Sequence, residues 1–414
     1  MKIIQIVSRV IVILLFLSVL VLIIAFARGY RIDLRSKTLT PTGIIAISAY
    51  PKATKVFLNG VFKGATDLNM TLPPGEYQVE IKKEGYTSWS KQVRLRGELV
   101  VALEGLLFPL NPSLSPLTNM GLTKVVPIPQ SEKILIFSEQ GNPEKDGIYL
   151  FDLGKGPISF LTPTKLILLK QTIFDTIGTV DFTKTTVSIS PDNKEILLTF
   201  PTLPEEISYL LSLDEETKVL TDIEASKATL LAAWEQEKAS LRKKILEAYP
   251  KEISKIASDS FGIISFSPDE LKVFYQAKAN VTLPIAINPR LLSTNQTLEE
   301  RSIEMNNTYV YDRKEDRNYK ITHFPQGVDN STLPEKELEQ TDYMQWYSDS
   351  KHLVIKEESK ISVLDFDDLN KQTIYSGPFD NSFFKVTTDG RIIILTNLNP
   401  EANKLPDLYA VGIR

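Results

Sequence analysis

Residues 188–200 read SISPDNKEILLTF and residues 265–277 read SFSPDELKVFYQA, so one local pattern occurs twice. Both stretches hold a short strand-like run, a Ser-Pro-Asp turn and a second, apolar strand-like run. Further copies read WYSDSKHLVIK from Trp346, VTTDGRIIILT from Val386 and, more weakly, IPQSEKILIFS from Ile128. Internal repetition is stronger evidence for a fold than the propensity of any one segment. The repeat therefore predicts an array of similar β-sheets.

Two more strand-like segments follow most copies. The third strands are expected at IYLFD from Ile148, YLLSLD from Tyr209, YVYD from Tyr309, ISVLD from Ile361 and LYAV from Leu408. The fourth strands are expected at ISFLT from Ile158, KVLT from Lys218, YKIT from Tyr319 and QTIY from Gln372. One four-stranded sheet cannot bury both of its faces alone, whereas sheets stacked around a ring can.

These repeats resemble the blades of β-propellers of the TolB-like and WD40-like class, in which the Ser-Pro-Asp turn joins the first two strands. We count five blades over residues 109–414, and the weak patterns of Lys165 to Val187 leave room for a sixth. The last unit ends after its third strand, so a closed ring needs a fourth strand from elsewhere. We predict that Leu106 to Leu117 supplies it by pairing beside Leu408 to Ile413.

Residues 43–108 alternate short strands with glycine and proline turns, which is typical of a small β-sandwich. Asn59-Gly60 is the strongest two-residue hairpin signal, because both positions tolerate positive φ. Tyr77, Val79 and Ile81 fall on one face of a later strand at period two.

This segment resembles the PEGA domain, in which V-x-L-x-G-x-x-x-G-x-T is followed by L-x-P-G-x-Y-x-V. The matching positions are Pro51, Ala53, Val56, Leu58, Gly60, Gly64, Thr66, Leu72, Pro74, Gly75, Tyr77, Val79, Gly85 and Tyr86. The chain departs from the eponymous tetrapeptide, since residues 51–54 read PKAT. The resemblance implies an envelope-associated β-module for surface or protein contacts, without catalytic residues. A simple structural spacer is the alternative.

Val10 to Ala27 reads VIVILLFLSVLVLIIAFA, without a charge or a helix breaker. At 1.5 Å per residue this stretch reaches about 27 Å, enough to cross a bilayer. We predict a transmembrane helix over residues 10–27, preceded by a short tail (1–9) and followed by a basic linker (28–42). A cleaved signal peptide is the alternative, because Ala25 and Ala27 form a small-x-small pattern after a basic start.

Two features of the sequence disagree about the side of the membrane on which the C-terminal body lies. Basic residues of the linker outnumber Lys2 and Arg9, and taken literally this places the body in the cytoplasm. A short tail before a long domain is, however, a common signal-anchor layout, and large domains translocate largely regardless of charge. We therefore expect a single-pass protein of a bacterial cell membrane with its C-terminal body extracytoplasmic.

Two insertions are expected within the propeller. Residues 223–257 hold a helix, because Ile223 to Tyr249 repeats apolar residues at spacings of three and four and Pro250 ends the run. This stripe either packs on the propeller or docks a partner; an exposed Trp234 would favour docking, so Trp234 is the candidate partner-binding residue. Residues 278–307, rich in Pro, Asn, Thr and Ser, are expected to form a long mobile loop and a surface lid.

Composition excludes several kinds of chemistry. The chain has no cysteine, and its net charge of -4 is spread without a basic block, so disulfides, thiolate sites and a nucleic-acid footprint are not expected. His323 and His352 lie far apart and are expected to be surface or strand residues. Asp192, Asp269, Asp349 and Asp389 recur in the turns, where aspartate hydrogen-bonds the backbone two residues on. We predict no catalytic residue, metal site or cofactor.

The domain architecture is the only indication of function. We expect a non-enzymatic binding or scaffold protein of the envelope, whose propeller binds a protein or glycan and whose PEGA-like module acts as a spacer or surface-binding unit. An enzyme acting on envelope polysaccharide through clustered carboxylates at the propeller mouth is the alternative. A sensor is a third hypothesis, which would need a partner because the N-terminal tail is short.

Overall fold

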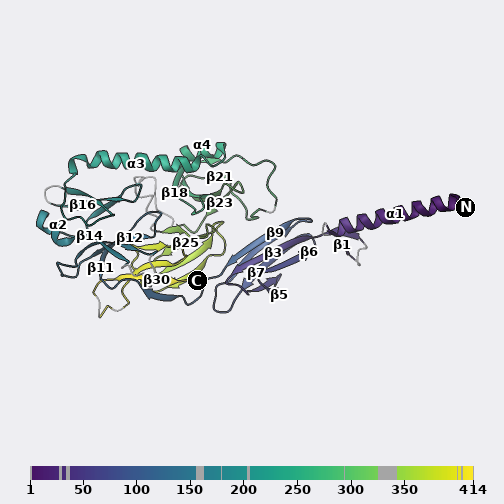
Figure 1. Ribbon diagram of the computed structural model, residues 1–414, viewed down its shortest axis with the longest axis horizontal. Coiled ribbons are helices and arrows are strands. Elements are labelled where there is room, and N and C mark those ends of the chain that lie inside the picture. The colour runs from purple at the N-terminus through teal and green to yellow at the C-terminus, as the bar shows by residue number, and fades with distance from the viewer. Residues whose placement is uncertain are drawn as a thin grey trace. The chain divides into compact units, whose positions relative to one another are not determined.

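The computed structural model describes residues 2–27, 30–33, 38–154, 163–178, 180–202, 206–292, 294–324, 343–398, 400–401 and 404–413. The chain forms two compact units. The first comprises Met1–Leu110 together with Ile287–Leu298, and the second comprises Asn111–Ala286 together with Glu299–Arg414. Strands dominate both units, and the N-terminus is a single helix (Figure 1).

Helix α1 (Lys2–Ala27) contains the apolar stretch predicted to cross a membrane. Its most apolar part, Val7–Ala25, spans 19 residues with a mean hydropathy of 3.0, and none of it is buried against the protein. A buried core helix of a soluble protein would be covered by other elements. The helix is therefore long enough and apolar enough to cross a bilayer, and it passes equally the length and composition test for a signal sequence.

The predicted linker contains structure of its own. Strands β1 (Tyr30–Asp33) and β2 (Thr38–Pro41) pair antiparallel, with Tyr30 opposite Pro41. The sequence predicted only a polar, basic linker here, because neither four-residue strand shows the alternation of a half-buried strand. The hairpin returns the chain to a point close to where the linker began.

Residues 43–106 form the predicted β-sandwich of two sheets. One sheet has the order β6-β3-β9, with β3 and β9 parallel, and the other has the order β5-β4-β7-β8. Buried side chains such as Ile45, Val79 and Val93 fill the space between the sheets. The strands are β3 (Gly43–Tyr50), β4 (Lys55–Leu58), β5 (Val61–Ala65), β6 (Leu68–Leu72), β7 (Gly75–Lys82), β8 (Trp89–Leu95) and β9 (Val100–Leu106).

The Asn59-Gly60 hairpin forms as the sequence predicted. Asn59 and Gly60 have φ of 50° and 78°, and Leu58 pairs with Val61 across the turn. We expect Gly60→Val to destabilise this hairpin by about 1 kcal/mol, because a β-branched residue is strained at positive φ. Hydrogen exchange of the β4 and β5 amides should quicken in Gly60→Val, and unchanged exchange there would contradict the assignment of the turn.

Within the described residues, five of the six sheets of the second unit form the propeller, and we call them blades one to five. Blade one is β11 (Leu122–Pro127), β12 (Lys133–Ser138), β13 (Gly147–Asp152) and β14 (Thr164–Leu169); blade two is β15 (Thr186–Ile189), β16 (Glu195–Pro201) and β17 (Glu206–Ser212); blade three is β18 (Phe261–Phe266), β19 (Lys272–Ala277), β22 (Thr308–Asp312) and β23 (Arg317–Ile321). Blade four is β24 (Met344–Trp346), β25 (His352–Glu357), β26 (Lys360–Asp365) and β27 (Gln372–Ser376); blade five is β28 (Phe384–Val386), β29 (Ile392–Thr396), β30 (Asp407–Gly412) and β10 (Ser113–Pro116).

Neighbouring blades stack through opposite faces of their central strands. In blade one, Leu135 and Phe137 join the apolar cluster shared with blade two, whereas Ile134 and Ile136 join the cluster shared with blade five. A third cluster joins blades three and four. Central strands are therefore buried on both faces, which explains why their sequences are apolar runs rather than alternating ones.

One of the predicted fourth strands is wrong, another lies outside the described residues, and no sixth blade is formed within the described residues. Residues 158–162 lie outside the described part of the chain, and β14 is the fourth strand of blade one instead. Residues 218–221 form no strand; Thr217 donates its N–H to the Ile167 carbonyl of β14. The weak pattern of Lys165 to Val187 is divided among β14, helix α2 (Lys170–Ile177) and β15.

The predicted clasp is confirmed. Strand β10 pairs antiparallel with β30, with Ser113 opposite Gly412 and Pro116 opposite Tyr409. Blade five therefore combines three strands from the C-terminus with one from residues before blade one. This pairing holds the two ends of the ring together.

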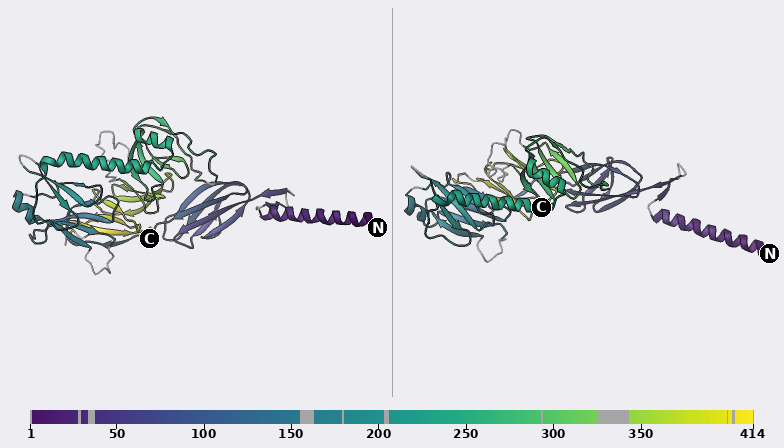
Figure 2. Two further views of the ribbon diagram at one scale, coloured as in Figure 1. Left: turned by 45° about the horizontal axis from the view of Figure 1, so that its top comes forward. Right: turned by 90° about the horizontal axis from the view of Figure 1, so that it is seen from above.

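Helices α3 (Glu224–Leu246) and α4 (Lys251–Ser260) form the predicted helical insertion and lie outside the sheets of the second unit (Figure 1, Figure 2). Trp234 is only 7% exposed, which favours packing of the helix on its own unit over docking through this residue. Tyr249, between the helices, donates its hydroxyl to the Glu270 carbonyl of blade three at 3.2 Å.

The predicted loop insertion contains order. Strands β20 (Val281–Thr282) and β21 (Ser302–Ile303) pair at its base. At its far end, the Gln296 side chain accepts the Arg94 N–H at 2.7 Å and donates to the Arg94 carbonyl at 3.0 Å, so it binds the edge of β8 as another strand would. The insertion was expected to be a mobile lid, but its far end instead belongs to the first unit, where Gln296 covers the edge strand β8.

Candidate binding face of the propeller

The turns between the first and second strands of the blades gather at one end of the sheets, which we call the turn face. The Asp192, Asp269 and Asp349 carboxylates each accept the N–H two residues on, at 3.1, 3.0 and 2.9 Å. Asp389 accepts the corresponding N–H at 3.3 Å. The predicted role of these aspartates is confirmed. In each turn the residue directly after the aspartate has positive φ; these residues are Asn193, Glu270, Ser350 and Gly390.

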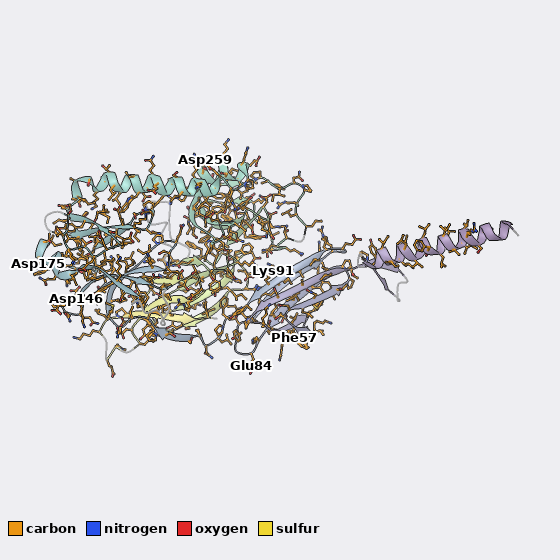
Figure 3. All side chains as sticks on the ribbon, in the orientation of Figure 1. Phe57, Glu84, Lys91, Asp146, Asp175 and Asp259 are labelled. Atoms are coloured by element: carbon orange, nitrogen blue, oxygen red, sulfur yellow. The ribbon has the colours of Figure 1, made fainter. Side chains whose placement is uncertain are left out.

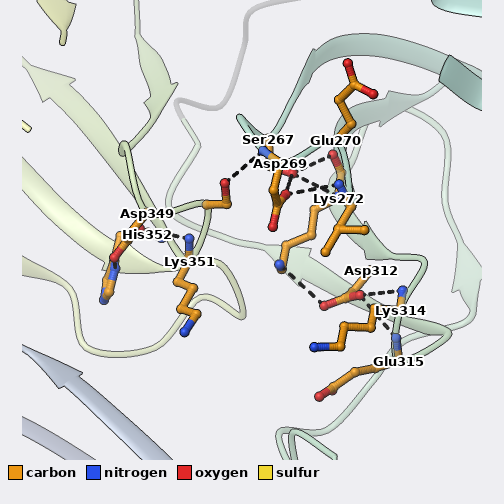
Figure 4. A network of polar contacts seen from close by, with 12 residues as sticks. Ser267, Asp269, Glu270, Lys272, Asp312, Lys314, Glu315, Asp349, Lys351 and His352 are labelled. Atoms are coloured by element: carbon orange, nitrogen blue, oxygen red, sulfur yellow. Dashed lines mark hydrogen bonds and ion pairs between the residues drawn. The ribbon is translucent and has the colours of Figure 1, made fainter. Parts of the chain in front are cut away.

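Adjacent turns are also bonded to each other. Asn193 donates to the Pro129 carbonyl of blade one at 2.9 Å, and the Thr388 N–H of blade five donates to the Glu132 carboxylate at 2.8 Å. Blades three and four are joined by the Asp269 N–H and the Ser350 hydroxyl at 3.1 Å (Figure 4). Tyr347 donates its hydroxyl to the Gly390 carbonyl at 3.1 Å, which joins blades four and five. These bonds fix the turns in place relative to one another.

A buried charge pair lies behind the turn face in blades three and four. The second strand begins with a cation and the third ends with an aspartate directly opposite it. Lys272 lies 3.6 Å from Asp312, and His352 lies 2.7 Å from Asp349 (Figure 4). His352 also lies 3.2 Å from Asp365. Sequence reasoning placed His352 on a surface or strand and missed this pairing. The signal was a basic residue opening the second strand in the copies at Lys133, Lys272 and His352.

The four turn carboxylates have lowered pKa values, which fits a structural role in the turns rather than acid catalysis. The hydrogen bond from Ser190 lowers the pKa of Asp192, and hydrogen bonds and nearby cations lower the pKa of Asp269 and Asp389 against the opposing effect of burial. Burial likewise opposes ionisation of Asp349, but the charge of His352 together with hydrogen bonds from His352 and Lys351 lowers the pKa overall. A general acid working near neutral pH needs a raised pKa. These four carboxylates are ionised acceptors for their own turns.

The remaining candidate residues do not join a common site. His323 lies 2.9 Å from Asp368 beside blade three, and Trp234 is on α3. Among the described residues, no group of three His, Asp or Glu side chains is placed to hold a metal ion. Sequence reasoning also missed three side chains of inner strands that bridge blades: Lys124 donates to the Thr185 carbonyl, Lys385 to the Ile128 carbonyl and Gln345 to the Phe384 carbonyl.

Comparison with known proteins identifies the first module. Residues 42–109 match the family model of the PEGA domain, which agrees with the resemblance seen in the sequence. No curated protein matches the chain.

The solved structures that resemble the chain include β-propellers. They include a putative TolB from Agrobacterium tumefaciens (11% identity, 69% of this chain and 70% of that chain, TM-score 0.20) and TolB from Acinetobacter baumannii (12%, 82% and 61%, TM-score 0.20). The β-propeller domain of the Trilobed protease from Pyrococcus furiosus is another (10%, 90% and 96%, TM-score 0.22). The blade assignment rests on the sheet topology of this chain itself.

Proposed function

We propose that this protein is a membrane-anchored, extracytoplasmic binding or scaffold protein of the cell envelope, and that the turn face of its propeller binds a protein or glycan. The apolar helix α1 carries the proposal. Its 19-residue apolar span has no covering element in its own unit, so lipid is the partner that suits it.

The turn face suits recognition for two physical reasons. Exposed charges of both signs, among them Lys194, Lys351 and Asp389, lie on turns that are tied to one another by hydrogen bonds. Side chains on such a framework lose little freedom when a partner binds, and this lowers the entropic cost of association. The lowered pKa of the turn aspartates favours a charged recognition surface over the alternative of an acid-catalysed polysaccharide hydrolysis.

The anchor and the orientation can be tested together because the chain has no cysteine. A single cysteine at Asp175, exposed on α2, should react with a membrane-impermeant maleimide in intact cells, whereas one at Gln5, at the start of α1 before its apolar span, should react only after permeabilisation. The full-length product should stay with membranes in alkaline carbonate. Protection of residue 175, or a mature product that starts after Ala27, would overturn the proposal.

The binding face can be located with the same strategy. We expect a photo-crosslinker on Lys351→Cys, at the turn face, to give adducts of discrete mass in intact cells. The matched control is Asp259→Cys, which is exposed on α4 (Figure 3) and precedes β18, whereas the turn of blade three follows that strand. Adducts from residue 259 with none from residue 351 would move the binding site to the helical insertion.

A further inference from the structure

Exposed apolar side chains lie on both faces of the edge strand β5 of the PEGA-like sandwich. Val61 and Phe62, on the edge strand β5, are 56% and 55% exposed. Phe62 lies opposite Phe57 of β4, and their ring centroids are 5.7 Å apart in an edge-to-face arrangement (Phe57 is labelled in Figure 3). We call Phe57, Val61 and Phe62 the aromatic edge. Such side chains gain free energy when an apolar partner covers them.

Cations surround the aromatic edge. Lys55 and Lys63 are exposed on the same two strands, and the Lys82 ammonium lies 5.4 Å from the centre of the Phe57 ring. The nearby acids on this sheet already face bases, since Glu80 pairs with Lys82 and Glu76 pairs with Arg94. The edge therefore combines aromatic rings with positive charge, which is the chemistry of side chains that sit at a lipid headgroup layer.

The chain is also electrically divided. Residues 28–110, which follow the apolar helix, contain 12 Lys and Arg against 7 Asp and Glu, a formal charge of +5, whereas residues 111–414 contain 33 against 44, a formal charge of -11. An anionic surface attracts the first part and repels the second. Charge complementarity thus favours a negatively charged surface as the partner of the first unit only.

The linker limits how far this module can move from the membrane. Because Tyr30 pairs with Pro41, the residues between them add no length to the path from the end of α1 to the start of β3. That path consists of three residue steps from Ala27 to Tyr30, the width of the pair, and two steps from Pro41 to Gly43. It spans at most roughly 23 Å, whatever conformation residues 28 and 29 adopt. The Asn59 N–H bonds to the Gln78 carbonyl, three residues into β7. The hairpin tip therefore lies only about 10 Å along the sandwich from the end where β3 begins.

From these observations we propose that the aromatic edge docks on an anionic lipid surface beside the membrane anchor, with Phe62 and Val61 at the headgroup layer and Lys55 and Lys63 on lipid phosphates. The proposal rests on α1 being an uncleaved anchor. The opposite edge of the same sheet, β8, is already bound by Gln296, which leaves β5 as the edge open to lipid.

The test uses the full chain in nanodiscs with a nitroxide on the single cysteine of Val61→Cys. In discs containing anionic lipid, the label should be reached by oxygen and shielded from a water-soluble relaxation agent. In neutral discs the water-soluble agent should reach it. A label at Ala102→Cys, exposed on β9 of the other sheet, should face water in both. Lys55→Gln with Lys63→Gln should lower the docked-to-free ratio roughly 30-fold, about 1 kcal/mol per lysine.

The possible results separate the two proposals. A chain that does not enter nanodiscs overturns both the anchor and the docking. A chain that enters but leaves residue 61 exposed to water in anionic discs overturns the docking alone. Shielding of residue 61 from both reagents also overturns it, because the cover would then be protein, either a second copy or another partner.

Discussion

Asp407→Ala is expected to open the propeller at its seam. Asp407 begins β30, is 5% exposed, and accepts three hydrogen bonds at one carboxylate oxygen. The donors are the Thr118 hydroxyl at 2.8 Å, the Met120 N–H at 2.9 Å and the Gly121 N–H at 3.1 Å. This single side chain therefore fixes the segment that leads from β10 to β11, between blades five and one.

Removing the carboxylate leaves two backbone N–H groups without their acceptor at the closure point. An unpaired buried polar group costs about 1–3 kcal/mol, so we expect a loss of about 3–5 kcal/mol in the free energy of unfolding of the second unit. Urea denaturation of the full chain in detergent measures this loss. Hydrogen exchange should quicken first in β10 and β30, the two strands of the clasp.

Asp175→Ala is the matched control. Asp175 is an exposed aspartate of α2 that accepts a hydrogen bond from Gln171 in the adjacent turn, at 2.6 Å. Its removal should change stability by no more than about 0.5 kcal/mol. If Asp407→Ala is as stable as Asp175→Ala, the seam is held by apolar packing of the blades rather than by this carboxylate.

The blades could be predicted from sequence where a strand is central or a turn is specific. The second strands are apolar because both faces are covered, and the Ser-Pro-Asp turns recur because Asp192 and its counterparts each accept a particular N–H. These constraints act within a few residues, so the same short sequence pattern recurs in each blade. The clasp could be predicted because a ring lacking one strand must take it from the other end of the chain.

The outer strands β23 and β27 were predicted, but those of blades one and two were not, because outer strands pair on one side only and accept many sequences. Strand β14 lies beside β13 partly because Gly147 leaves room for it: a Cβ there would lie 2.5 Å from the Leu168 carbonyl oxygen. The sequence of either strand alone does not reveal this close contact between the two backbones. For Trp234, periodicity predicted an apolar face for the helix, but not that this side chain would be covered.

His352 was misjudged for a similar reason, since its partners come from two segments. Asp349 lies in the turn before β25, and Asp365 ends β26 directly opposite His352. In isolation, a histidine among strand residues gives no sign of a charge. Only the alignment of repeats shows a basic residue facing an aspartate at the same place in blade three.

His352 should make the propeller less stable as the pH rises. The imidazole is 6% exposed, and although burial acts to lower its pKa, the Asp349 and Asp365 carboxylates raise it from 6.5 to about 10. Because the folded pKa lies above the unfolded one, this stabilisation is fully present below pH 6.5 and is lost as the pH rises towards 10. Unfolding followed at pH 6, 8 and 10 should show the decline.

His352→Gln should cost about 3–5 kcal/mol at pH 6, because it leaves two buried carboxylates without their cation, and should flatten the decline between pH 6 and 10. The chain has only one other histidine, so His323→Gln is the matched control and also assigns the imidazole signals in an NMR titration. The remaining signal should keep the shift of an imidazolium past pH 8. A midpoint near 6.5 would show that the charge pair behind the turn face does not form, and that blade four is held by its apolar cluster alone.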